Sequence, residues 1–511
     1  MTSRTVRFLH RTWIAGAALA MASGSVALAG PPQAVAPCAA CHGAHGEGNA
    51  QAGFPRLAGL PAGYIVAQLH AFAAGARANG IMHGIAAGLS ARRMQAIGAY
   101  YAGLHTPTVA SAAKPAPKQA AAGREIVVNG LWQKNMPSCD ACHGLGARGI
   151  GTTFPPLAGQ PASYIAAQLD AWRHAARPAG PAALMPAVVK ALSAAQVQDA
   201  AAYLATLPAT GAVPKTAHPD LAPASADAMP GFFQPPLEKN LPKGKFGASV
   251  RRGHDIFMDT PRYAKAYVGN GLSCQNCHTN RGRQAQAAPM WAAWVLYPKY
   301  RGKNHRVNTM AMRNEGCFRY SENAQGSPAG NPPADSSPVI RDLSSYMFWM
   351  AKGAPTGERM KGQGYPPIAA PATPPSRTRG ARIYAENCAG CHGGNGQGLR
   401  QADGDDAFPP LWGPRSFNWG AGMHRINTAA SFILHNMPLG RPNSLSPQQA
   451  WDVAAFMDSH PRPQDPRYNG DLTRTIARYH AHPAIDDYGK TMDGLRLGAP
   501  GTLAEWAKTH P

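Results

Sequence analysis

Four copies of the pattern C-x-x-C-H constrain what this 511-residue chain can fold into. The spacing lets two thiols form thioethers with the two vinyl groups of one porphyrin, while the adjacent histidine binds the iron. Zinc and redox C-x-x-C motifs do not require a histidine directly after each pair. The sequence therefore predicts four covalently bound haem c groups. Their cysteines and histidines are Cys38, Cys41 and His42; Cys139, Cys142 and His143; Cys274, Cys277 and His278; and Cys388, Cys391 and His392.

A haem of this kind usually takes its second axial ligand from a residue downstream of the motif. In three of the four segments, a methionine lies between 40 and 45 residues after the histidine. His435 is close enough to compete with the third of these methionines. We predict the methionine as the distal ligand in each segment. The predicted pairs are His42 with Met82, His143 with Met185, and His392 with Met437.

The ninth cysteine, Cys317, occupies the corresponding position in the remaining segment, 39 residues after His278. A single leftover cysteine in an exported protein is often a buried apolar residue or an intermolecular disulfide partner. The register of Cys317 with the three methionines favours a functional role instead.

Flanking segments repeat with the haem motifs and predict the same helical unit four times. A glycine lies before three of the motifs, where it would allow two helices to cross closely, at Gly123, Gly253 and Gly380. Downstream, apolar residues at helical spacing follow a Ser or Asp cap signal in all four units. An aromatic recurs in these helices and is expected to pack at the helix crossing, at Tyr100, Tyr203, Tyr346 and Phe456. Cys38 lies only eight residues after Gly30, so the first unit should lack its N-terminal helix or have a very short one.

These repeats predict a mainly α protein of four class I cytochrome c domains arranged as two dihaem modules. Pro- and Ala-rich stretches between the repeats read as extended linkers. The expected division is a signal peptide at 1–29, cytochrome c domains at 30–105 and 119–210, a linker at 211–240, domains at 241–365 and 376–465, and a C-terminal wrapping tail at 466–511.

The N-terminal stretch carries three arginines before an apolar run and ends in small residues, which is typical of a cleaved secretory signal. A periplasmic location is expected, and no other stretch reaches the roughly 20 apolar residues of a membrane span. The formal net charge of +22 comes from dispersed basic residues without interleaved aromatics. This pattern indicates attraction of small anions rather than nucleic-acid binding.

The N-terminal half resembles the c4-type dihaem cytochromes over residues 30 to about 210. The stretch FPRLAGLPAGYIVAQLHAF in the first unit recurs as FPPLAGQPASYIAAQLDAW in the second. The resemblance implies a pair of His/Met haems that transfer electrons and perform no chemistry of their own.

Residues 245 to 500 resemble the dihaem thiosulfate dehydrogenases, through YVGNGLSCQNCHTNRGR, YPKYRGKNHRVNTMAMRNEGCFRYSEN, FILHNMPLG and HPRPQDPRYNGDL. The resemblance implies that two thiosulfates are coupled to tetrathionate, or the reverse, at a haem whose distal ligand is Cys317. It places Lys303, Arg313 and Ser321 at substrate-binding positions, with a lysine at 303 where the family carries arginine. Lysine keeps the charge but loses the bidentate fork of arginine.

The whole chain thus looks like a fusion of the dehydrogenase with its electron acceptor. Electrons would pass from the Cys/His haem to the His/Met haem of residues 376–465. They would then cross the N-terminal module to a periplasmic or membrane-bound acceptor. Arg301, Arg306 and Arg319 are further candidate cations, and Asn436 stands where relatives can place a lysine ligand. Two alternatives remain open: a multihaem protein that only carries electrons, and a sulfur-oxidation enzyme that conjugates thiosulfate to a protein cysteine.

Overall fold

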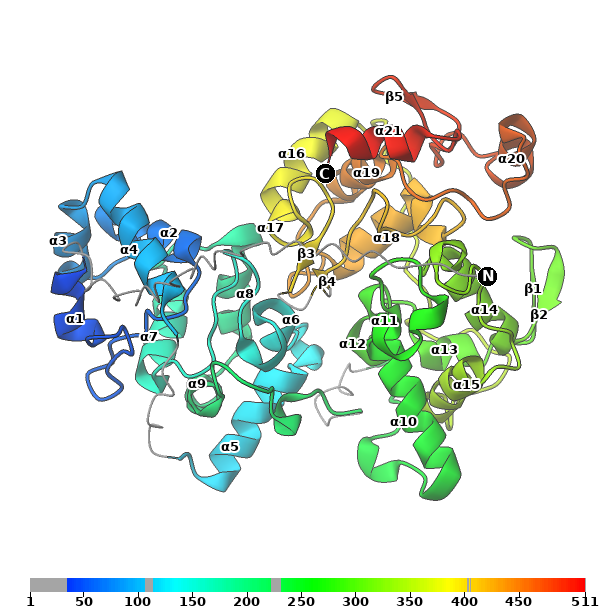
Figure 1. Cartoon of the computed structure of the whole chain (residues 1–511). Helices are drawn as coiled ribbons and strands as arrows, with labels where there is room; N and C mark the ends of the chain where they lie inside the picture. Colours follow the sequence, from blue (N-terminus) through cyan, green and yellow to red (C-terminus); the bar gives the residue numbers. More distant parts are fainter. Residues whose placement is uncertain (1–34, 106–113, 222–230, 402–403, 405, 511) are drawn as a thin grey trace, which may run out of the picture.

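The computed structural model describes residues 35–105, 114–221, 231–401, 404 and 406–510. The predicted signal peptide, and residues 222–230 of the predicted 211–240 linker, lie outside the described residues. The described chain forms two lobes, with the N-terminal third on the left in Figure 1 and the remainder on the right.

The N-terminal lobe is built from short helices. They are α1 (Ala36–His42), α2 (Ala62–Ala73), α3 (Gly80–Ala87), α4 (Ala91–Gly103), α5 (Pro117–Arg124), η1 (Glu125–Asn129), α6 (Asp140–His143), α7 (Ala162–Arg173), α8 (Leu184–Ala191) and α9 (Ala194–Thr206).

The C-terminal lobe is also mainly helical, with three antiparallel strand pairs among its described residues. Its first part holds α10 (Gly244–Met258), α11 (Thr260–Tyr263), α12 (Thr279–Gly282), α13 (Met290–Trp294), β1 (Lys299–Arg301), β2 (Arg306–Asn308), α14 (Met310–Tyr320) and α15 (Pro338–Met350). Its second part holds α16 (Arg377–Asn387), α17 (Ala389–His392), β3 (Leu399–Arg400), β4 (Asp406–Phe408), α18 (Ile426–Asn436), α19 (Pro447–Asp458), α20 (Leu472–Tyr479), β5 (Thr491–Met492), β6 (Leu495–Arg496) and α21 (Thr502–Thr509).

The four helices predicted downstream of the haem motifs are present as α4, α9, α15 and α19. Each begins after a serine whose side chain accepts a hydrogen bond from a backbone N–H in the first turn. Such a cap satisfies one of the N–H groups that a helix start leaves without a partner. The capping serines are Ser90, Ser193, Ser337 and Ser446. The predicted mainly α class is confirmed.

The three predicted crossing glycines lie where an upstream helix meets its downstream partner. A Cβ on Gly123, Gly253 or Gly380 would clash with a carbonyl oxygen of the facing helix. Each glycine also faces the Cβ of the recurring aromatic, namely Tyr203, Tyr346 and Phe456 in turn. In the first unit, α1 is the first described helix and no described helix precedes its haem motif. Tyr100 is partly exposed, as is Phe456, whereas Tyr101 is buried.

The repeated motif of the N-terminal lobe forms the contact between its two units. Arg77 donates to Gln68 over 2.7 Å and to Tyr164 over 3.0 Å. Arg177, in the second unit, donates to Gln168 of its own unit over 2.9 Å and to Tyr64 of the first unit over 3.0 Å. Each tyrosine therefore accepts from the arginine of the other unit, and each glutamine accepts from the arginines of both units.

Four large hydrophobic clusters form the core, and each packs against one cysteine of a different C-x-x-C-H motif. These cysteines are Cys38, Cys139, Cys274 and Cys388. The C-terminal segment covers the cluster at Cys388 through the buried Trp506. It also covers Trp419 through Tyr488 and Leu497.

The two lobes meet at the rings of Phe154 and Phe408, whose centroids are 5.1 Å apart. Cys142 and Cys391, from the second and fourth haem motifs, pack against this aromatic contact. Arg441 also donates to the backbone oxygen of Ala182 across the junction. The junction thus brings together haem-motif cysteines of the two lobes.

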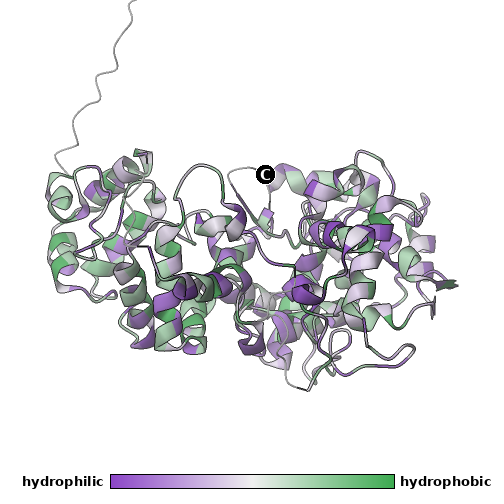
Figure 2. Cartoon of the chain, turned by 90° about the horizontal axis from the view of Figure 1, so that it is seen from below, coloured by the Kyte–Doolittle hydropathy of each residue, from purple (hydrophilic) through white to green (hydrophobic). Residues whose placement is uncertain are grey.

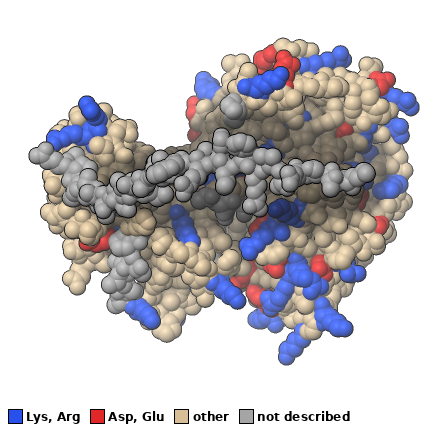
Figure 3. Space-filling model, viewed as in Figure 1, with Lys and Arg blue, Asp and Glu red and all other residues tan. Residues whose placement is uncertain are grey.

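Polar and apolar residues alternate along the helices of both lobes in Figure 2. Among the described residues, every helix is too short or too polar to cross a bilayer. Figure 3 shows Lys and Arg side chains scattered over the visible face, with fewer acidic ones between them.

Candidate haem and anion site

The four motif histidines share one arrangement. In each, Nδ1 is hydrogen-bonded to a backbone carbonyl downstream, at 2.8 to 2.9 Å. The acceptors for His42, His143, His278 and His392 are Pro55, Pro155, Ala288 and Pro409. Burial lowers the pKa of all four imidazoles, and that of His278 falls to about 4. A neutral ring with Nδ1–H committed to a carbonyl leaves Nε2 as a free ligand, which is the orientation that binds a metal.

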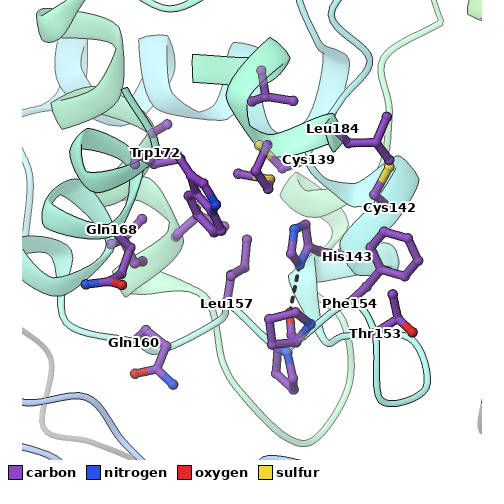
Figure 4. A pocket seen from close by; sticks show the side chains of 18 of the residues that line it. Cys139, Cys142, His143, Thr153, Phe154, Leu157, Gln160, Gln168, Trp172 and Leu184 are labelled. Atoms are coloured by element: carbon purple, nitrogen blue, oxygen red, sulfur yellow. Dashed lines mark hydrogen bonds between the residues drawn. The ribbon is translucent and has the colours of Figure 1, made fainter. Parts of the chain in front are cut away.

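The space beside His143 fits a haem c. A cavity with about 1370 Å³ not filled by protein, part of it open to solvent, is lined by Cys139, Cys142 and His143. Met185 lines the same cavity, and most of its other lining side chains are apolar. Figure 4 shows the imidazole and the two thiols around one space, with the hydrogen bond of His143 drawn as a dashed line. Thioether attachment, a proximal nitrogen and a distal sulfur are therefore all available from one apolar pocket.

The other two methionines predicted as distal ligands lie on or directly after helices that contribute to the hydrophobic clusters at Cys38 and Cys388. Met82, on α3, packs against the same hydrophobic cluster as Cys38. Met437 directly follows α18, whose Leu434 is buried in the cluster at Cys388. The competing His435 is hydrogen-bonded through Nδ1 to the side chain of Asn443 at 3.0 Å.

Helix α14 places Arg313 and Cys317 one turn apart, on the same face. Nη1 of Arg313 donates to Sγ of Cys317 over 2.8 Å. The electrostatic interaction with Cys317 is the main cause that raises the pKa of Arg313, although burial opposes it. Burial raises the pKa of Cys277 to about 12, with further contributions from Glu322 and Cys317. The lone thiol therefore lies within electrostatic reach of the third haem motif.

Lys303 reaches the same region from the turn between β1 and β2. Its Nζ lies 3.6 Å from the centroid of the Tyr320 ring and donates to the backbone oxygen of Gly420. Burial, followed by the charges of Arg467 and Arg313, holds the pKa of Lys303 well below its usual value. Lys303 and Arg467 both lie over the ring of Tyr320, three residues after Cys317.

The remaining candidates differ in their surroundings. Ser321 is the C-cap of α14, and its N–H donates to the carbonyl of Cys317 over 2.8 Å. Arg301 donates to the Tyr297 hydroxyl over 2.8 Å. Arg319 forms an ion pair with Glu315 one turn before it, so its charge is already partnered. Arg306 is exposed.

Arg467, in the C-terminal segment, was missed by sequence reasoning. Its guanidinium carbon lies 5.3 Å from the Tyr320 centroid, and its charge is the leading electrostatic influence on Lys303. The segment HPRPQDPRYNGDL contributes to the family resemblance, but no spacing rule links it to a cysteine more than 100 residues earlier.

Comparison with family models identifies three cytochrome segments. Residues 29–104 match the cytochrome c family. Residues 120–204 and 375–457 match the family described as cytochrome C oxidase, cbb3-type, subunit III. These matches confirm cytochrome c domains and indicate covalently bound haem c.

The two halves of the chain resemble two kinds of curated protein. A thiosulfate dehydrogenase of Stutzerimonas stutzeri (strain A1501) is 50% identical over 276 residues, which is 54% of this chain and 88% of the relative. A thiosulfate dehydrogenase electron acceptor of Thiomonas intermedia (strain K12) is 47% identical over 180 residues, covering 35% of this chain and 82% of the relative.

One solved structure spans both halves. The thiosulfate dehydrogenase (TsdBA) of Marichromatium purpuratum, in its as-isolated form, superposes with a TM-score of 0.81 at 48% sequence identity. The match covers 90% of this chain and 95% of that chain. A fusion of an electron-acceptor module with a dehydrogenase module is therefore the architecture that this chain shares.

Proposed function

Because the chain belongs to the thiosulfate dehydrogenases, fused on its N-terminal side to an electron-acceptor module, we propose that it interconverts thiosulfate and tetrathionate beside Cys317. In the oxidative direction two thiosulfate dianions join through a new sulfur–sulfur bond, releasing one tetrathionate dianion and two electrons. No proton is taken up or released, so charge stabilisation is the main task of the surrounding side chains.

The contact between Arg313 and Cys317 carries this proposal. A guanidinium that donates to sulfur favours the thiolate, which is the nucleophilic and metal-binding form of cysteine. Lys303 adds a second cation beside Tyr320, and the two charges can hold a dianionic substrate and reduce the repulsion between two of them. Cys317 would serve as the distal ligand at His278 and take part in forming the sulfur–sulfur bond. Ser321, at the end of the same helix, is proposed to line the substrate site.

Four haem c groups, when bound at the four motifs, would supply one-electron carriers for the two released electrons. Met82, Met185 and Met437 are the proposed distal ligands of the other three. Thioether ligation gives a higher potential than thiolate ligation, so the site at Cys317 would have the lowest potential of the four.

Protein contacts support electron transfer from the active-site domain to the N-terminal module. The Tyr365 hydroxyl donates to the carbonyl of Cys277 over 3.2 Å, and its ring packs on Phe432 of α18 with centroids 5.3 Å apart. The Phe154 and Phe408 contact then connects the fourth motif with the second. We propose that electrons leave the protein through the N-terminal module to a periplasmic or membrane-bound acceptor.

The test uses the purified holoprotein. Thiosulfate with ferricyanide should yield free tetrathionate, and tetrathionate with a reduced dye should yield thiosulfate. A protein that only carries electrons would not be reduced by thiosulfate. An enzyme that conjugates thiosulfate to a partner's cysteine would form no free tetrathionate. Either result would overturn the proposal.

A further inference from the structure

Four buried titratable side chains lie next to the proposed anion site and have no part in the reaction described above. The side chains of His424, His480, Asp465 and Asp486 are at most 3% exposed. Three of them come from the C-terminal end of the chain, and His424 ends the short 3-10 helix η11 (Gly422–His424) before α18. Burying this many ionisable groups is costly unless each finds a partner.

The four side chains form one hydrogen-bonded row. His480 contacts Asp465 through Nε2 at 3.0 Å and Asp486 through Nδ1 at 2.8 Å. The same oxygen of Asp486 lies 2.9 Å from Nε2 of His424. Nδ1 of His424 contacts the backbone oxygen of Ala421.

His480 lies between two carboxylates, one at each ring nitrogen. A neutral imidazole has one donor and one acceptor nitrogen, so it would leave a lone pair facing a carboxylate oxygen. The protonated ring donates from both nitrogens and satisfies both partners. Burial alone would lower the pKa of His480, but the two carboxylates outweigh it and the pKa is raised.

One end of the row holds Arg467. Nε and Nη2 of this guanidinium contact Asp465 at 2.9 and 2.5 Å. Nη1 makes no hydrogen bond to any residue in the described part of the chain, and the side chain is 15% exposed. Asp465 contacts both Arg467 and the protonated His480. Because one carboxylate faces two positive charges, it does not neutralise the guanidinium completely.

The other end of the row reaches Lys303. Ala421, which holds His424, directly follows Gly420, whose carbonyl accepts from Nζ of Lys303. Lys303 therefore lies at one end of the hydrogen-bonded row and Arg467 at the other. Both side chains lie over the ring of Tyr320.

We propose that Arg467 is a further substrate-binding cation of this site, and that His480 with Asp465 and Asp486 positions it. The inference rests on the proposed function, and the free Nη1 donor is the group that would contact an oxygen of thiosulfate or tetrathionate. His480 is a positioning residue, since it reaches the substrate only through Asp465 and Arg467.

The experiment measures anion binding without turnover. The oxidised holoprotein is titrated with tetrathionate by calorimetry in the absence of an electron donor. Arg467→Gln should raise the Kd about tenfold or more, the loss expected for one charge-assisted hydrogen bond. Arg467→Lys, which keeps the charge but not the fork, should give a smaller increase.

His480→Gln should also raise the Kd, although this residue does not contact the anion, and the absorption spectrum of the cysteine-ligated haem should stay unchanged. Arg474→Gln is the matched control, because Arg474 is exposed on α20 and lies outside the row. If Arg467→Gln does not assemble with its haems, Arg467→Lys and His480→Gln carry the test.

The outcomes separate this inference from the proposed function. Wild-type protein that binds no tetrathionate overturns both. The wild type could bind tetrathionate and be active while the variants bind it equally tightly. That result would overturn only the role of Arg467 and His480. His424, His480 and Asp486 could also group around a metal ion. If the wild type contains one equivalent of non-haem metal and His480→Gln does not, these residues bind a metal ion. That result would overturn the proposal that His480 is protonated between Asp465 and Asp486.

Discussion

Arg313 donates to the sulfur of Cys317 over 2.8 Å from one turn earlier in the same helix. A single helix therefore supplies both the thiol and a cation that contacts it. The i to i+4 spacing of a helix brings the two side chains to the same face.

Replacing Arg313 with Gln should lower kcat/KM for thiosulfate by about 10- to 100-fold, the range for losing one hydrogen bond to a charged group. Steady-state kinetics with ferricyanide measures the effect. Arg319→Gln is the matched control, since Arg319 lies on the same helix but is paired with Glu315. Equal losses in both variants would contradict the assigned role of Arg313.

Replacing Cys317 with Gly should abolish tetrathionate formation while leaving the covalent haem content unchanged. Replacing it with Met should raise the potential of the lowest-potential haem, because a thioether stabilises ferric iron less than a thiolate does. A redox titration followed by absorbance measures this shift. An unchanged set of potentials in Cys317→Met would show that Cys317 is not an iron ligand.

The affinity for thiosulfate should fall as the pH rises through the lowered pKa of Lys303. The pKa of Lys303 is lowered well below 10.5, so its ammonium loses its proton, and with it the attraction for a dianion, at a lower pH than an ordinary lysine. KM should increase as pH passes through this pKa. In Lys303→Arg the charge persists, since guanidinium stays protonated. The variant should show a flat KM over the same range, and an identical rise in KM would assign the titration to another group.

Replacing Gly253 with Ala should destabilise the active-site domain by about 1–3 kcal/mol, the usual effect of overpacking. The added Cβ meets the carbonyl oxygen of Asp342 and the Cβ of Tyr346 where α10 crosses α15. Denaturant unfolding of the holoprotein measures the change. Gly103→Ala is the control, because that helical glycine has no neighbour within 4 Å of an added Cβ, and it should leave stability unchanged or slightly raised.

Local spacing accounts for what the sequence predicted well. In all four units the capping serine lies nine or ten residues before the recurring aromatic, and a crossing glycine precedes three of the haem motifs, because each motif lies in a helical unit with its own core. The nearness of Arg313 to Cys317 follows in the same way from helix geometry. The same reasoning treated Arg319 as a candidate cation, since sequence alone does not show that Glu315 neutralises it.

Spacing along the chain does not predict contacts between segments that are far apart in the sequence. The sequence by itself determined where haem can be attached, which helices surround it and which thiol stands apart, because these depend on residues within one or two helical turns or one repeat. Only the tertiary structure decided that Arg467 and Lys303 share the ring of Tyr320, that His480 is held between two carboxylates, and that Phe154 meets Phe408. Packing of the C-terminal segment and of the two lobes creates these contacts, and no periodicity along the chain encodes them.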